Sequence, residues 1–153
     1  MAIYLRALTA ILLWVVVLPA KTADDLLDPD QAFAFSARLV SSRAIEVTYR
    51  IAEGYYLYRN AFRFSVQPAT VRIGEPQYPA GAWHHDEFFG RSEIYRQQVT
   101  VRIRLESKPA RTGFRLIAVS QGCADIGVCY LPSTKVADLV PLKLLGALEP
   151  ALQ

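Results

Sequence analysis

The feature that most constrains the fold is a repeated alternation of apolar and polar residues over short segments. The clearest case runs from Val99 to Leu105, where every second residue is apolar and polar residues stand between them. A period of two is typical of a strand with one buried face. Similar short apolar segments, separated by turn residues, lie at residues 33–39, 45–51, 55–58, 62–66, 71–73, 114–120 and 136–144.

This spacing predicts an all-β fold. Roughly seven to nine short strands, with turn residues about every ten positions, are typical of an antiparallel β-sandwich of immunoglobulin-like type. No segment of useful length repeats with the helical period. A chain of 153 residues is long enough for one domain with its own core.

The N-terminus has the pattern of a secretory signal peptide. Residues 1–20 contain a short segment with one positive charge at Arg6, an apolar run over residues 7–18, and Pro19-Ala20. We expect cleavage near residues 20–23, then an acidic leader over 21–30, the sandwich over 31–145 and a tail over 146–153. No later apolar run reaches eighteen residues, so no membrane span is expected after signal removal.

The predicted export of the chain and its net charge limit the classes of function that fit the sequence. An exported chain enters an oxidising compartment, which is the periplasm in a Gram-negative cell, and cysteines can form disulfides there. The formal net charge of +3 falls to +2 without Arg6, and the basic residues are scattered along the sequence. Nothing in this pattern indicates a nucleic-acid partner.

The two cysteines of the chain, Cys123 and Cys129, lie in one short glycine-containing segment. A bridge that closes seven residues contributes only about 2.4 kcal/mol in the chain-entropy model, so a stabilising role is a weak reason for it. We interpret the pair as a redox-active disulfide on a loop. A structural staple is the alternative, since this spacing is a weaker redox signal than Cys-x-x-Cys. Metal handling through the reduced thiols, His84 and His85 is a third hypothesis.

Two other stretches contain residues suited to support a reactive disulfide. Asp86 and Glu87 precede Phe88 in the segment 83–95, which lacks clean periodicity. Carboxylates beside a cysteine disfavour its thiolate and can exchange protons with it, and Phe88 could cover the sulfurs as a lid. In Tyr55–Tyr58, alternate side chains share a face and could flank the cysteines. Ordinary core packing and solvated loop charges are the alternative for these residues.

Five stretches in the same order resemble the N-terminal periplasmic domain of the thiol:disulfide interchange protein DsbD. They are Asp30–Phe35, Gly54–Arg59, Trp83–His84 with Asp86–Phe88, Ser92–Arg96, and Gln121–Asp125 with Gly127 and Cys129–Tyr130. Full-length members continue into a membrane-spanning electron carrier and a thioredoxin-like domain, whereas this sequence ends at Gln153. The sequence is therefore expected to be a separately encoded module or a fragment.

The resemblance implies a protein-disulfide reductase activity that uses no cofactor. Electrons would come from the thioredoxin-like donor of a DsbD-type membrane system. They would pass to periplasmic disulfide isomerases and to a cytochrome c maturation thioredoxin. Cys129 would form the mixed disulfide with partners, and Cys123 would resolve it.

The resemblance also implies roles for the neighbouring residues. Phe88 would form the tip of a cap loop that shields the pair, and Phe89 stands beside it where a tyrosine is common. The acidic groups near the cysteines would be Asp86 and Glu87, and the flanking aromatic residues would be Tyr56 and Tyr58. A secreted immunoglobulin-like interaction module with a purely structural disulfide is the alternative function.

Overall fold

The computed structural model describes residues 26–107 and 112–140. The described residues form a short helix, α1 (Pro29–Ala32), one 3-10 turn, η2 (Arg59–Ala61), and eleven strands. The strands are β1 (Phe33–Ser41), β2 (Ala44–Ile51), β3 (Tyr55–Tyr58), β4 (Arg63–Gln67), β5 (Ala82–Asp86), β6 (Gly90–Tyr95), β7 (Gln98–Arg104), β8 (Phe114–Ser120), β9 (Gly122–Ala124), β10 (Val128–Cys129) and β11 (Ser133–Leu139).

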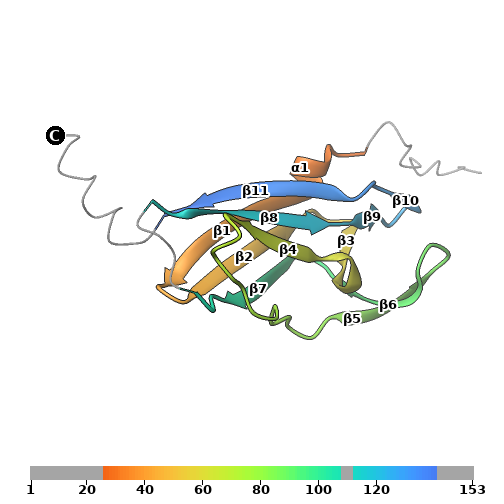
Figure 1. Cartoon of the computed structure of the whole chain (residues 1–153). Coiled ribbons are helices and arrows are strands. Elements are labelled where there is room, and N and C mark those ends of the chain that lie inside the picture. The colour runs from red at the N-terminus through yellow and green to blue at the C-terminus, as the bar shows by residue number, and fades with distance from the viewer. Residues whose placement is uncertain (1–25, 108–111, 141–153) are drawn as a thin grey trace, which may run out of the picture.

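The strands form three antiparallel sheets. Their strand orders are β1-β2-β7, β11-β8-β4 and β10-β9-β3-β6-β5. The first two sheets face each other as the layers of a sandwich, and the third extends from one end of it (Figure 1). The predicted all-β, immunoglobulin-like sandwich is confirmed by this arrangement and by the structural comparison given below.

The main core lies between the two sandwich sheets. In β7 the apolar residues of the predicted alternation, Val99, Val101 and Ile103, are buried, while Arg102 and Arg104 are exposed. Strand β3 differs, because both of its faces are buried. Tyr55 and Leu57 join the main core, and Tyr56 and Tyr58 join a second, smaller apolar cluster that contains Cys123.

Four elements differ from the sequence-based expectation. Residues 71–73 form no strand, and Ile73 makes only an isolated bridge with Leu105. Residues 82–95 form the β5–β6 hairpin, although their sequence shows no clean alternation. The segment around the cysteines, expected to be a loop, forms the short β9–β10 hairpin. The last strand begins at Ser133, three residues earlier than expected, and the predicted continuation beyond residue 140 lies outside the described residues.

The described part of the predicted leader makes hydrogen bonds to the rest of the domain. The backbone N–H of Leu27 donates a hydrogen bond to the hydroxyl of Tyr55 at 2.9 Å, and Tyr130 donates to the carbonyl of Leu27 at 2.6 Å. The predicted signal peptide and the predicted tail lie outside the described residues. Among the residues that are described, no helix is long and apolar enough to cross a membrane.

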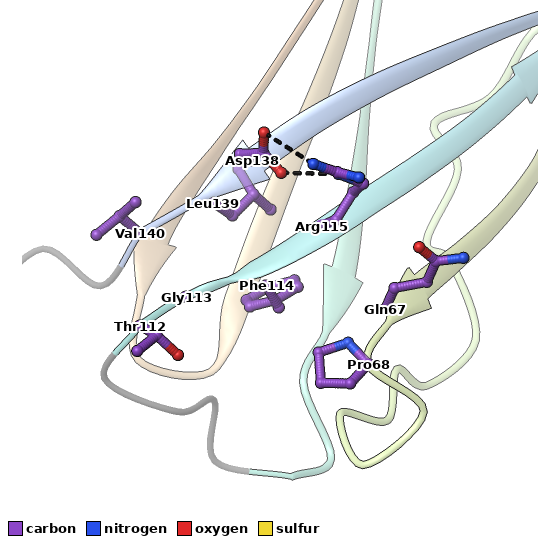
Figure 2. Close-up of a pocket in the computed structure, with 9 residues that line it drawn as sticks. All are labelled: Gln67, Pro68, Thr112, Gly113, Phe114, Arg115, Asp138, Leu139 and Val140. Atoms are coloured by element: carbon purple, nitrogen blue, oxygen red, sulfur yellow. Dashed lines mark hydrogen bonds and ion pairs between the residues drawn. The ribbon is translucent and has the colours of Figure 1, made fainter.

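A surface cavity of about 650 Å³ lies where β4 ends and β8 begins (Figure 2), and the β9–β10 hairpin lies at the other end of the sandwich (Figure 1). Its wall includes Gln67 and Pro68 at the end of β4 and the ion pair between Arg115 and Asp138. No cysteine, histidine or other nucleophilic group suited to disulfide chemistry lines it.

Candidate active site around the disulfide

Cys123 and Cys129 form a disulfide that bridges the β9–β10 hairpin. The two residues are direct cross-strand partners, and Val128 pairs with Ala124 beside the turn. Cys123 is fully buried, whereas Cys129 is half-buried on the edge strand of its sheet. An attacking thiolate therefore reaches the sulfur of Cys129 more easily than that of Cys123.

Glycines allow the hairpin to sit tightly on β3. Gly127 has a φ of +84°, which a residue with a side chain adopts only with strain, and it closes the turn. Gly122 pairs with Leu57 of β3. A β-carbon at position 122 would lie 2.2 Å from the carbonyl oxygen of Tyr56, so only glycine permits this approach.

A polar network connects the sulfurs to the β5–β6 hairpin. The hydroxyl oxygen of Tyr58 lies 3.2 Å from Sγ of Cys123 and 4.0 Å from Sγ of Cys129. The same hydroxyl donates a hydrogen bond to Oδ2 of Asp86 at 2.7 Å, and Tyr56 donates to that oxygen at 3.4 Å. Asp86 is thus linked to the disulfide through Tyr58.

The other oxygen of Asp86 holds the turn between β5 and β6, residues Glu87 to Phe89, which we call the cap loop. Its Oδ1 accepts hydrogen bonds from the backbone N–H groups of Phe88 at 2.9 Å and Phe89 at 2.8 Å. The ring of Phe89 packs on that of Tyr58, with 4.4 Å between ring centroids. One carboxylate therefore joins the cap loop to the tyrosine that touches both sulfurs.

The polar network determines the protonation states of Tyr58 and Asp86. Burial raises the pKa of Tyr58 far above its usual value, and the neighbouring Tyr56 and Asp86 raise it further, so its hydroxyl stays protonated. Burial also raises the pKa of Asp86, but hydrogen bonds from Phe89, Tyr58 and Phe88 outweigh this effect, and the net pKa lies below its usual value. At neutral pH the pair is a hydroxyl donor and a carboxylate acceptor.

Comparison with known protein families identifies the family of this chain. The family model described as "Thiol:disulfide interchange protein DsbD, N-terminal" matches residues 23–141. The chain belongs to the DsbD N-terminal domain family. This result confirms the resemblance inferred from the five sequence stretches.

Curated relatives of the DsbD N-terminal family are similar over most of the described chain. DsbD 1 of Pseudomonas aeruginosa is 46% identical over 110 residues, which are 72% of this chain and 18% of that protein. DsbD of Klebsiella pneumoniae is 48% identical over 110 residues, again 72% of this chain and 18% of the relative. The chain thus spans about a fifth of the length of these relatives.

Solved DsbD N-terminal structures share the fold. The crystal structure of the Neisseria meningitidis DsbD N-terminal domain in its reduced form gives a TM-score of 0.72 with 33% identity, covering 78% of this chain and 94% of that one. The complex between the DsbD N-terminal and PilB N-terminal domains of the same organism gives a TM-score of 0.64 with 32% identity, over 74% and 87% of the two chains.

The remaining predicted site residues occupy different environments. Glu87 is exposed in the cap loop, and Phe88 is 49% exposed. The aromatic contact with Tyr58 comes from Phe89. The structure therefore brings Asp86, Tyr56, Tyr58 and Phe89 to the disulfide network, although Phe89 is itself 41% exposed.

The two histidines lie on opposite faces of β5, because successive side chains in a strand alternate. His84 packs against Tyr56, with 4.8 Å between rings, and its Nε2 lies 3.7 Å from Oδ2 of Asp86. His85 is exposed. Within the two described ranges, no group of three or more histidine, cysteine or acidic residues is arranged to hold a metal ion.

Sequence reasoning missed the contribution of Arg96 in this DsbD N-terminal domain. Its guanidinium pairs with Asp125 in the β9–β10 turn at 2.8 Å and lies over the ring of Tyr56, 5.1 Å from the centroid. Arg96 thus ties the cysteine hairpin to β6 and to the tyrosine cluster. The sequence contained a signal for this ion pair in two of the five stretches that resemble the DsbD N-terminal domain. Ser92–Arg96 ends in one member of the pair, and Gln121–Asp125 ends in the other.

Proposed function

We propose that the chain is a periplasmic thiol–disulfide oxidoreductase module of the protein-disulfide reductase type. It relays electrons from a thioredoxin-like donor to oxidised periplasmic proteins, among them disulfide isomerases and a cytochrome c maturation thioredoxin. Membership of the DsbD N-terminal family supports this proposal. Two solved structures of the Neisseria meningitidis relative support it further, one of the domain in its reduced form and one of its complex with the PilB N-terminal domain.

The observation that carries the proposal is the unequal burial of Cys123 and Cys129. A donor thiolate attacks Sγ of Cys129 on the edge strand, the S–S bond breaks, and its electron pair leaves on Sγ of Cys123, which takes up a proton. The second donor thiol then displaces Cys129 and leaves the donor oxidised. Two electrons and two protons pass to the pair, and the reverse sequence delivers them to an acceptor disulfide.

The proposal is tested by following the redox state of the pair with a thiol-specific maleimide and mass spectrometry. The oxidised domain is mixed with a reduced, purified thioredoxin-like domain. We expect two maleimide labels per chain, and we expect their loss after an oxidised disulfide isomerase is added. A Cys123→Ala/Cys129→Ala double variant is the control for labelling of the other proteins. A pair that stays unlabelled with every donor supports the structural-disulfide alternative instead.

A further inference from the structure

A line of polar groups runs from the buried sulfur of Cys123 toward solvent, and its outermost contact is longer than a hydrogen bond. From that sulfur the contacts run to the hydroxyl of Tyr58 (3.2 Å), on to Oδ2 of Asp86 (2.7 Å) and then to Nε2 of His84 (3.7 Å). Exposure rises along this line. Cys123 and Tyr58 are 0% exposed, whereas the side chains of Asp86 and His84 are 11% and 30% exposed.

The exchange reaction creates a need for such a connection. When a thiolate attacks Cys129, the leaving electron pair makes a thiolate of Cys123 in a position with no exposed surface. Burial disfavours a charged thiolate, and the carboxylate of Asp86 lies only one residue away through Tyr58. A proton must therefore reach Cys123 through the protein.

We propose that His84 is the solvent end of a proton relay that serves Cys123 through Asp86 and Tyr58; this inference rests on the proposed function. A protonated imidazole at His84 gives a proton to the carboxylate of Asp86, Asp86 passes a proton to the oxygen of Tyr58, and Tyr58 gives its hydroxyl proton to the thiolate. One proton moves from His84 to Cys123, and it returns when Cys123 resolves a mixed disulfide. His84 touches neither sulfur, so it acts as a positioning residue.

The contacts around His84 favour this role. Its 3.7 Å separation from Asp86 exceeds a hydrogen bond, so proton transfer between them requires a bridging water or a rotation of the imidazole ring. Tyr56 packs on the ring, and Ser92 of β6 pairs opposite and donates its hydroxyl to the carbonyl of Phe89. The nearby charges of Arg96 and Asp125 neutralise each other, and Glu87 is exposed.

The adjacent histidine is a matched control within the same strand. His85 has the same chemistry and is one position away, but it lies on the opposite face of β5, where it pairs with Arg91. Replacing either histidine by glutamine removes one imidazole and keeps a polar side chain of similar size. Only His84→Gln interrupts the line of contacts to Cys123.

The test measures the rate at which dithiothreitol reduces the disulfide between about pH 5 and pH 8, the range in which an imidazole changes charge. Each rate is divided by the concentration of dithiothreitol thiolate, so that only the contribution of the protein remains. For the wild type and His85→Gln, we expect the normalised rate to fall about tenfold with rising pH. This tenfold change is smaller than the rate enhancement that a general acid in direct contact with the reacting group provides. We expect a low, flat profile for His84→Gln and for Tyr58→Phe.

The possible results distinguish a failure of the proton relay from a failure of the proposed function. A wild-type disulfide that dithiothreitol does not reduce at any of these pH values overturns the proposed function and the relay together. A disulfide that is reduced with the same pH profile in the wild type and in His84→Gln overturns the relay alone. Equal loss of the pH dependence in His84→Gln and His85→Gln also overturns the relay. The loss of a histidine charge would then explain the result without any contact between His84 and Asp86.

Discussion

Replacing Cys129 by serine is expected to reduce thiol–disulfide exchange to the background rate, whereas replacing Cys123 by serine is expected to trap partner proteins. Cys129 is the half-buried member of the pair and Cys123 is fully buried. A thiol at position 129 can therefore still form a mixed disulfide. Without Cys123 that intermediate is not resolved inside the domain, so it accumulates.

These two variants control for each other. Each loses the same disulfide, so each loses the same chain-entropy contribution of about 2.4 kcal/mol. A difference in trapping between them therefore reports on chemistry and not on stability. The measurement is mass spectrometry of mixed disulfides after incubation with an oxidised thioredoxin-like protein. Equal amounts of mixed disulfide in both variants would contradict the assignment of Cys129 as the attacking residue.

Replacing Gly122 by alanine is expected to destabilise the domain by about 3 kcal/mol, at the upper end of the cost of overpacking a core. The added β-carbon would lie 2.2 Å from the carbonyl oxygen of Tyr56, 2.7 Å from Cζ of Phe33 and 2.9 Å from Cδ2 of Leu57. A backbone oxygen cannot rotate away as a side chain does. Strands β3 and β9 must therefore separate, and the contact between Tyr58 and Cys123 is lost.

Gly127→Ala is the matched control for this prediction. A β-carbon at Gly127 meets nothing within 4 Å, so the only cost comes from its φ of +84°, about 1 to 2 kcal/mol. In thermal denaturation we expect the midpoint of Gly122→Ala to fall by about 10 °C or more, and that of Gly127→Ala by clearly less. A smaller loss for Gly122→Ala would show that β3 and β9 are not packed as closely as the structure has them.

The regular strands could be predicted because each has one face in the core and one in solvent. Val99, Val101 and Ile103 are buried, and their neighbours Arg102 and Arg104 are exposed. The alternation of apolar and polar residues in the sequence therefore matches the alternation of buried and exposed side chains in the strand. The β5–β6 hairpin could not be predicted in this way. Its exposed face includes Trp83, which is 64% exposed, and hydrophobicity alone does not place such a residue in solvent.

The candidate site was predictable where local spacing determines which side chains share a face. Alternation in Tyr55–Tyr58 places Tyr56 and Tyr58 on one side of β3, as the structure has them. The contact between His84 and Asp86 could have been found by the same rule, once residues 82–86 were known to form a strand. The distance from Asp86 to Cys123 through Tyr58 depends on the pairing of β3 with β9, which no local pattern contains.

The reduction potential of the Cys123–Cys129 pair tests the central claim most directly. The domain is equilibrated with glutathione or dithiothreitol buffers, and the reduced fraction is counted by alkylation and mass spectrometry. A protein that relays electrons must exchange them reversibly, so we expect a potential between roughly −120 and −270 mV. A value below about −300 mV would mark the disulfide as structural and would contradict the proposed relay.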